Sequence, residues 1–557
     1  MSASIQAGGQ SAPPTRPQSE AYTPQDHLSY KSKQEPGSEA EEGIEEAFGP
    51  ARDEESGFHQ HGGHHPEEKT RDMNIVDWDG PKDPENPQNW TKARKWQISM
   101  LTAALTFVVS FGSSVFSTAT QVTAQEFGAS EELMILGVTL YVLGFACGPL
   151  VWGPLSEIYG RRNPLMVGIF GFIVFQIPVA VASNLETIFI CRFFAGAFGS
   201  APLAIVAGMY VDFWDPVMRG IATMGYAGAV FAGPAVGPIV GEFTVKNLHL
   251  GWRWTAWFTM IMAAVFFVIA LPTIPETLAP MILKRKAARL RVETKNWALH
   301  SKLEEEPVQV GALVRKYGLK PLQMIVLEPI LIIMTLYISL VYGILYIIFF
   351  AYPFSFEIDR QIAFGTSSLP FIALFIGVLL ACTSMIWETM VIFTPKLNRA
   401  KKPIPEERLP PVSTWIERAQ TEPYLIVPVQ MIVGSVVLVI GLFWFAWTSF
   451  PSINPWPQII SGVFIGCGII MVFMPAVIYL VDVYLYDANS ALAANAFVRS
   501  FVAAAFPLFS TAMYTKLGVQ WATSLLAFLC LALVPAPILL YKYGQKIRSW
   551  SRFAFDL

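Results

Sequence analysis

Residues 153–165 read GPLSEIYGRRNPL, a short polar joint between two long apolar stretches of the chain. Glycine and small polar side chains allow the tight reversal that such a joint needs. The flanking stretches, residues 133–155 and 164–182, have the length of about 20 residues with which a helix crosses some 30 Å of hydrocarbon. The joint therefore predicts a hairpin of two membrane-spanning helices.

The composition of the whole chain indicates a membrane protein. The 557 residues are 53% hydrophobic and 15% charged, with a mean hydropathy of +0.44, whereas soluble domains carry roughly 25% charged residues. A soluble multi-domain enzyme is thereby excluded, and a net charge of −3 offers no basic surface for nucleic acid. Five cysteines lie scattered inside apolar runs without a C-x-x-C pair, so we expect no disulfide framework and no zinc site. The histidine-rich stretch at residues 58–65 could bind a metal but is more typical of a low-complexity tail, so we expect no metal site and no cofactor.

The same length criterion, applied to the whole sequence, predicts an all-α membrane protein with twelve transmembrane helices in two six-helix halves. The expected spans are residues 97–118, 133–155, 164–182, 187–211, 222–242, 252–273, 329–350, 364–386, 424–447, 456–480, 488–512 and 519–541.

The sequence divides into five parts on this basis. Residues 1–96 are rich in Ser, Gly, Pro, Gln, Glu and His, which predicts a disordered cytosolic tail. The N-terminal half, the central loop, the C-terminal half and the C-terminal tail follow at residues 97–273, 274–328, 329–541 and 542–557. A second polar loop, at about 394–423, separates the eighth and ninth spans.

The basic residues of the joints predict the orientation. Lysines and arginines concentrate in the joints on the side of the N-terminus, for example at Arg161, Arg162 and residues 284–291. The opposite joints hold little beyond Lys246, Arg253, Arg360 and Lys516. Because basic loops stay in the cytosol, both termini and both large loops are expected there.

Two six-helix halves joined by a loop are typical of transporters that rock about a site between the halves. A receptor, a scaffold or a membrane-embedded enzyme is the alternative. An enzyme would need metal ligands or an acid–base pair within the membrane. All seven histidines lie outside the apolar runs, and no carboxylate lies near the centre of a span. We therefore predict that the protein is not an enzyme and has no catalytic residues.

The joint at residues 153–165 carries charges that a plain turn does not need. Arg161 and Arg162 follow the charge rule, whereas Glu157 and the spacing of Gly153 and Gly160 need another explanation. Glu157 is expected either to pair with the two arginines or to meet the positive N-terminal end of a helix in the other half. Either contact would be a latch that breaks when the halves change orientation.

Two arginines, Arg192 in the fourth expected span and Arg499 in the eleventh, lie within apolar runs. A charge near the centre of a span costs at least roughly 2.5–3.5 kcal/mol, so both should face protein or a water-filled cavity. Arg192 lies in the outer half of its span, where snorkelling to the surface is the alternative. Asn495 lies one helical turn from Arg499, which fits a polar seam.

The fifth expected span contains small residues at a spacing of four and two prolines. The small residues form one ridge on a helix, which lets a neighbouring backbone approach closely. The prolines bend a helix because each removes a backbone donor. We expect this span to seal against the opposite half and slide past it. The residues are Gly225, Ala229, Gly233, Gly237 and Gly241 on the ridge, with Pro234 and Pro238.

Together these patterns resemble the major facilitator superfamily, and within it the fungal twelve-span drug:proton antiporter family of multidrug and toxin exporters. The resemblance extends over residues 90–555. Residues 153–165 look like the superfamily's signature loop, with Glu157 in the place of its usual aspartate. Residues 192–199 look like its fourth-span motif, and residues 220–238 look like its antiporter motif.

Further segments are more distinctive of the fungal branch, and a few positions depart from the family pattern. The segments are LYVLGF, GWRW, PET, PEERL and ANSALAANAFVRS, at residues 140–145, 251–254, 275–277, 405–409 and 488–500. Ala195 stands where a polar residue is common, and Ala229 and Pro238 replace two glycines. The first span has neither the proline motif nor the acid of some relatives at residues 110–120, so the resemblance identifies no proton carrier.

The resemblance implies a monomeric plasma-membrane exporter that moves a hydrophobic or amphipathic small molecule outward in exchange for protons. Asp212, at the cytosolic end of the fourth span, would join the latch, and Arg192 would modulate proton movement. A vacuolar membrane is the alternative location. The alternative functions are a facilitator or importer of a nutrient such as a polyamine or vitamin, and a receptor that transports nothing. A polyamine would favour acids in the cavity, and the spans contain few.

Overall fold

The computed structural model describes residues 74–305, 318–363, 366–393, 429–484 and 487–553. Its regular elements are helices, apart from an isolated bridge between Ile75 and His300. The predicted loop at 394–423, residues 405–409 of the family pattern and most of the predicted N-terminal tail lie outside the described residues.

Six membrane-spanning segments form the first half of the described chain, and three of them consist of shorter helices in series. They are α2 (Lys92–Ser114) with η2 (Val115–Ala119) and α3 (Thr120–Phe127), α4 (Glu131–Cys147) with α5 (Pro149–Ile158), α6 (Arg162–Ala180), α7 (Leu185–Gly199) with α8 (Ala201–Phe213), α9 (Pro216–Lys246) and α10 (Arg253–Thr273). Side-chain caps determine where several of these helices begin. The Ser130 hydroxyl accepts the N–H of Leu133, and the Asn184 side chain accepts that of Thr187.

The second half repeats this arrangement. Its elements are α14 (Lys320–Leu327), α15 (Pro329–Pro353) with η4 (Phe354–Asp359), α16 (Phe371–Glu388) with η5 (Thr389–Phe393), α18 (Val429–Trp447), α19 (Pro455–Val483), α20 (Ala488–Leu533) and α21 (Pro535–Arg548). Between the halves, α11 (Ala279–Thr294) and α12 (Lys302–Glu305) occupy part of the central loop.

The helix α20 contains two membrane crossings. Eleven apolar helices of sufficient length occur in the described residues, and the last extends from Ala488 to Leu540. With 46 residues, α20 alone would measure about 69 Å, roughly twice the hydrocarbon thickness. Gly518 interrupts it with φ 71° and ψ 164°, outside the helical region. This break falls between the last two predicted spans, so the prediction of twelve crossings is confirmed.

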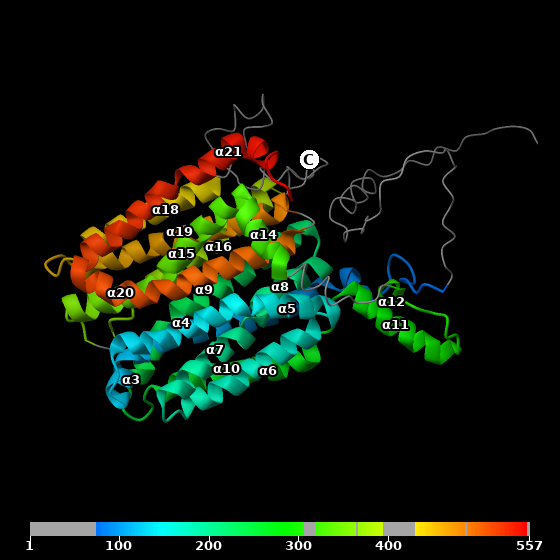
Figure 1. Cartoon of the computed structure of the whole chain (residues 1–557), viewed down its shortest axis with the longest axis horizontal. Helices are drawn as coiled ribbons and strands as arrows, with labels where there is room; N and C mark the ends of the chain where they lie inside the picture. The colour runs from blue at the N-terminus through cyan, green and yellow to red at the C-terminus, as the bar shows by residue number, and fades with distance from the viewer. Residues whose placement is uncertain (1–73, 306–317, 364–365, 394–428, 485–486, 554–557) are drawn as a thin grey trace, which may run out of the picture. The chain divides into compact units, whose positions relative to one another are not determined.

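The helices pack mainly within their own half. In the first half α2 packs on α9 and α4 on α7, and in the second α18 packs on α19 and α15 on α20. The most extensive packing between the halves is that of α4 with α20 and of α9 with α16. Figure 1 shows the first-half helices α4, α6, α7 and α10 lying together, and α15, α18, α19 and α20 lying together. Each joining pair contains the second span of one half and the fifth span of the other.

The N-terminal boundary differs from our expectation. We expected residues 1–96 to lack fixed structure, but residues 74–96 contain the helix η1 (Pro87–Asn89) and the first turn of α2. Val76 N–H bonds to the His300 carbonyl at 2.8 Å, and His300 N–H bonds to Asn74 at 2.9 Å. These residues escaped the composition argument because their order comes from contacts with a distant part of the chain.

The helix bundle has an inner end and an outer end. The inner end carries the joint at residues 159–161, and the charge pattern predicts that it faces the cytosol. The outer end carries the joint at residues 247–252.

Candidate functional site

A buried ion pair lies behind the joint at the inner end. The Arg161 Nε atom lies 3.4 Å from Asp212 Oδ2, and both side chains are largely buried. Arg161 Nη1 donates to the Ser156 hydroxyl at 2.9 Å, and the Thr277 hydroxyl donates to Asp212 at 2.9 Å. Arg161 and Asp212 were both expected in the latch, and the structure brings them together within the first half.

Glu276 caps the start of α6, a role that the sequence analysis missed. Its carboxylate accepts the backbone N–H groups of Arg161 at 2.7 Å and Arg162 at 3.3 Å. A carboxylate is favourable there because the N-terminal end of a helix is positive. Gly160 has φ +87°, and a Cβ at this position would lie 2.2 Å from Glu276 Oε2. Only glycine fits both the backbone angle and the close approach.

Glu157 does not pair with the neighbouring arginines, contrary to the first of our two expectations. Arg161 pairs with Asp212, and Arg162 Nη2 donates to the Leu271 carbonyl at 2.7 Å. Glu157 Oε1 accepts instead from Asn489 Nδ2 at 3.2 Å. Because Asn489 lies in the first turn of α20, the second expectation, contact with the start of a helix in the other half, describes this structure.

The packing of the described residues does not explain why a glycine stands at position 153. A Cβ at Gly153 would meet nothing within 4 Å. Its predicted part in the latch stays a prediction.

The glycine ridge of α9 packs within the first half, which corrects our expectation that it seals the two halves. A Cβ at Gly233 would lie 2.7 Å from Phe107 O, and one at Gly237 would lie 2.0 Å from the Ser114 hydroxyl. Gly241 faces Val115 and Thr118 in the same way. The ridge therefore fits against α2 and η2, and the helix α9 continues through Pro234 and Pro238.

Another face of α9 meets the second half. Gly228 faces Cys382 of α16, whose Sγ atom would lie 3.2 Å from an added Cβ. Phe231 packs edge-on against Phe473 of α19, with ring centroids 4.8 Å apart, and against Tyr342 of α15 at 6.1 Å. Gly225, the first ridge residue, has nothing within 4 Å of its Cβ position. The periodicity predicted a close-packing helix correctly but assigned the wrong face to the interface.

Arg192 is fully enclosed and does not snorkel. Its side chain is 2% exposed, Nε donates to the Gly137 carbonyl at 3.0 Å, and Nη1 donates to the Gly112 carbonyl at 2.9 Å. The guanidinium carbon lies 4.7 Å from the ring centre of Phe116 and 4.5 Å from that of Tyr141. Arg192 thus connects the first, second and fourth spans.

Arg499 of the second half also rests on aromatic rings and is partly buried. Its guanidinium carbon lies 4.8 Å from the ring centres of both Tyr342 and Phe473. Asn495, one turn earlier, donates from Nδ2 to the Thr335 hydroxyl of α15 at 3.0 Å. The predicted polar positions therefore face α15 and α19.

Tyrosines of α15 lie between the two arginines. The Tyr346 hydroxyl lies 3.5 Å from that of Tyr342 and donates to the Ser113 hydroxyl of α2 at 3.1 Å. This hydrogen bond crosses between the halves near mid-span. We call these residues the arginine–aromatic cluster: Ser113, Phe116, Tyr141, Arg192, Phe231, Tyr342, Tyr346, Phe473 and Arg499. The tyrosines could not be singled out from the sequence, because aromatic residues are spread through all the spans.

The halves also contact at the outer end. Glu242, near the end of α9, is 2% exposed and accepts a hydrogen bond from Ser367, which precedes α16. Contacts between the halves thus occur at the inner end, near the middle and at the outer end of the described bundle. Glu242 was missed because it lies at the boundary of an expected span, where an acid is unremarkable.

The segment at residues 74–91, which precedes α2, is held against α11 by ion pairs of Lys286 with Asp79 and Asp83. We call these ion pairs the clamp. Lys286 Nζ, on a 4% exposed side chain, pairs with Asp79 at 2.9 Å and with Asp83 at 3.0 Å. The backbone N–H of Asp79 is the largest influence that lowers the pKa of Asp83 to about 2, ahead of the contacts with Glu85 and Lys286. Burial opposes this lowering only in part. Both charges therefore persist at neutral pH.

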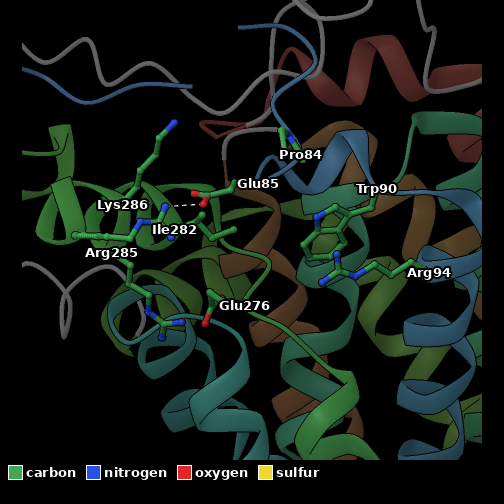
Figure 2. Close-up of a pocket in the computed structure, with 9 residues that line it drawn as sticks. Pro84, Glu85, Trp90, Arg94, Glu276, Ile282, Arg285 and Lys286 are labelled. Carbon is green, nitrogen blue, oxygen red and sulfur yellow. Dashed lines mark hydrogen bonds and ion pairs between the residues drawn. The ribbon is translucent and has the colours of Figure 1, made fainter. Parts of the chain in front are cut away.

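A cavity of about 330 Å³ lies beside this clamp. Figure 2 shows it between the N-terminal segment and α11, which contribute both acidic and basic side chains. Its lining residues are Pro84, Glu85, Trp90, Arg94, Glu276, Ile282, Arg285, Lys286 and Arg289. In the described part of the chain, no three His, Cys, Asp or Glu side chains come together as a metal site.

The family model of the Major Facilitator Superfamily matches residues 102–507. The chain is 51% identical to the citrinin biosynthesis cluster MFS transporter of Monascus ruber, over 87% of this chain and 93% of that protein. It is 47% identical to the ascochitine biosynthesis cluster MFS transporter of Didymella fabae (87% and 90% covered). It is 43% identical to the cercosporin MFS transporter of Cercospora nicotianae (86% and 90%).

Solved structures show the same fold at low sequence identity. The proton:xylose symporter XylE bound to 6-bromo-6-deoxy-D-glucose superposes with a TM-score of 0.56 at 14% identity, over 82% of this chain and 96% of that chain. A partially occluded inward-open XylE from E. coli gives 0.52 at 16% identity, over 80% and 99%.

Proposed function

The chain belongs to the major facilitator superfamily, and from this premise we propose that it exports a hydrophobic or amphipathic secondary metabolite in exchange for protons. The superfamily consists of secondary transporters rather than enzymes. Three relatives at 43–51% identity carry names that refer to fungal metabolites. Their extensive coverage of this chain supports export of a compound of that kind.

The contacts between the halves carry the mechanistic part of this proposal. Glu157 and Asn489 join the halves at the inner end through one hydrogen bond, and Glu242 and Ser367 join them at the outer end. Single hydrogen bonds are weak enough to break and re-form as the halves rock. Alternate breaking of the two contacts would expose the interface first to one side and then to the other.

The charged groups near these contacts have two further roles, in holding the inner joint and in proton movement. Arg161, Arg162 and Asp212 hold the inner joint rigid, so that movement at Glu157 is transmitted to the whole half. Arg192 modulates proton movement through the first half. The transporter works as a monomer in the plasma membrane with both termini in the cytosol. Accessibility of tags at the two ends in intact cells tests this orientation, and tags on opposite faces would contradict it.

Flux from reconstituted vesicles tests the proposed activity. Vesicles containing the full chain are loaded with citrinin, ascochitine or cercosporin, the compounds in the relatives' names. A pH gradient is then imposed in each direction, with a protonophore as control. We expect flux of at least one compound opposite to the proton gradient and its loss with the protonophore. Flux unaffected by the gradient would indicate a facilitator, flux with the protons an importer, and binding without flux a receptor.

A further inference from the structure

The strongest unexplained feature is the pair of positive charges in the arginine–aromatic cluster. Arg192 belongs to α7 of the first half and Arg499 to α20 of the second. Among the described residues, no ion pair with a carboxylate involves either arginine. Because arginine keeps its proton in proteins, two positive charges lie within apolar spans without a carboxylate counter-ion among the described residues.

Both guanidinium groups also retain unused donors. Arg192 uses Nε and Nη1 on backbone carbonyls, but its buried Nη2 has no hydrogen-bond partner in the described structure. The buried Nε of Arg499 has none either. Buried donors of native proteins are generally satisfied, so an exception indicates a missing partner. The missing partner here must accept hydrogen bonds, and a negative charge would suit it best.

The surroundings favour a planar organic group. The arginines already rest on the faces of Tyr141, Phe116, Tyr342 and Phe473, which stabilises the cations but leaves the N–H edges free. The Tyr346 hydroxyl connects the surroundings of the two arginines. It donates to Ser113, which follows Gly112, the residue whose carbonyl accepts from Arg192. It also lies 3.5 Å from the hydroxyl of Tyr342, whose ring contacts Arg499. The free N–H edges are suited to an anionic oxygen, and the neighbouring aromatic faces and hydroxyl groups are suited to a conjugated ring that carries it.

We propose that the arginine–aromatic cluster binds the transported substrate as an organic anion, a carboxylate or phenolate attached to a planar conjugated ring. Arg499 makes the principal contact, since no hydrogen bond to the protein occupies its buried Nε, and Arg192 supplies the second positive charge from the opposite half. One anion would then join the two halves at their centre. This inference rests on the proposed function, because it identifies the substrate class of the same transporter.

A series of probes that share one aromatic ring system and carry a negative, neutral or positive substituent tests the inference. The probes are 9-anthracenecarboxylate, the neutral 9-anthracenemethanol and the cationic 9-(aminomethyl)anthracene. Binding to the full-length protein in detergent is followed by fluorescence anisotropy. We expect the carboxylate to bind about tenfold or more tightly than the alcohol, because a charge-assisted contact is worth at least that factor. Equal affinity, a preference for the amine, or no binding of the carboxylate at millimolar concentration would overturn the inference.

Variants assign the preference to the cluster. Arg499→Gln should weaken carboxylate binding about ten- to hundredfold and leave alcohol binding unchanged, and Arg499→Lys should restore part of the preference. Lys284→Gln, which removes an exposed positive charge of α11 outside the cavity, is the control and should bind like the wild type. Thermal unfolding of each variant establishes that it is folded. A charge preference that survives in both Arg499→Gln and Arg192→Gln would place the anion elsewhere and overturn the assignment.

Flux of the same probes separates this inference from the proposed function. Wild-type flux of the anthracene probes without any charge preference would overturn the anion site and leave the transporter intact. Selective carboxylate binding without flux in either direction would support the anion site and count against export.

Discussion

The Asn489 side chain donates a hydrogen bond to the Glu157 carboxylate at 3.2 Å, and this contact joins the two halves at the inner end. The carboxylate faces the first turn of α20, where the helix dipole favours a negative group. The relationship depends on both the charge and the hydrogen-bond acceptor of Glu157. The two properties can be separated by substitution.

We expect Glu157→Ala to abolish export while the amount of protein in the membrane stays unchanged. The alanine removes the charge and the acceptor, so the inner-end contact cannot re-form after each cycle. Glu157→Gln keeps an acceptor oxygen and should retain part of the activity. Export from loaded cells of a compound that the wild-type protein transports in the vesicle assay, normalised to surface abundance, measures the effect.

The control for this prediction is Glu186→Ala. Glu186 is an exposed acid in the first turn of α7, near the outer end, and its loss should leave export normal. Normal export by Glu157→Ala at normal abundance would remove the latch from the mechanism.

Gly233→Ala should destabilise the protein by about 1–3 kcal/mol, the usual cost of overpacking. The added methyl group would lie 2.7 Å from both Phe107 O and Phe111 N. These are backbone atoms of α2, so no side-chain rotation can relieve the contact. The thermal unfolding midpoint of the purified protein measures the loss.

The matched control for the ridge is Gly225→Ala, on the same face of α9. A Cβ at Gly225 would meet nothing within 4 Å, and alanine is a better helix former than glycine. Gly225→Ala should therefore unfold at the same temperature as the wild type or higher. Equal midpoints for the two variants would contradict the packing of the ridge on α2.

The fold was predictable because apolar length and basic joints are properties of local sequence. Span lengths gave the twelve crossings, and they placed the last boundary where Gly518 breaks α20. The residues of the inner joint were also found locally, since Arg161, Asp212 and Glu157 are polar groups at the ends of apolar runs.

The pairing of these residues was not predictable, since it depends on how distant helices meet. Glu157 contacts Asn489, which lies 332 positions later in the chain. The glycine ridge packs against α2 rather than against the other half. Periodicity shows which residues share a face but not which neighbour covers that face. The same limit applies to Tyr346, whose partner Ser113 lies in the opposite half.

Asp83→Asn should release the segment at residues 74–91 from α11. The substitution removes the charge that pairs with Lys286 and weakens acceptance of the Asp79 N–H. Hydrogen exchange of the Asp79 and Glu85 amides measures the release, which should appear as faster exchange. Asp77→Asn is the control, because Asp77 is exposed. In the described residues, the hydrogen bond found for its side chain is the one it accepts from the adjacent Trp78 N–H.

The clamp should be insensitive to pH between 5 and 8. The pKa of Asp83 is lowered to about 2 in the folded protein from an ordinary value of 3.8. Its stabilising contribution is therefore complete above the unfolded value and is lost only as the pH falls from about 4 toward 2. The pKa of Lys286 is raised, chiefly by its bonds to Asp79 and Asp83 acting against burial, so this charge also persists. Release of the segment between pH 5 and 8 would contradict the assignment.

Gly518→Ala should destabilise the last hairpin by roughly 1–3 kcal/mol, the usual cost of a residue held in a sparsely populated backbone region. Gly518 has φ 71° and ψ 164°, a combination that is essentially restricted to glycine. The space around it is not the obstacle, since an added Cβ would meet only the end of the Gln520 side chain at 3.1 Å. The backbone angle alone therefore predicts the loss.

The comparison with Gly153→Ala isolates this backbone effect. Gly153 lies within α5, and a Cβ there would also find open space, so this substitution should leave the thermal unfolding midpoint unchanged or raise it. Gly518→Asn should lose about as much as Gly518→Ala, because asparagine tolerates the left-handed helical region but not a ψ of 164° at positive φ. If Gly518→Ala unfolds at the wild-type temperature, the chain does not reverse at this residue, and the last two crossings must be divided elsewhere.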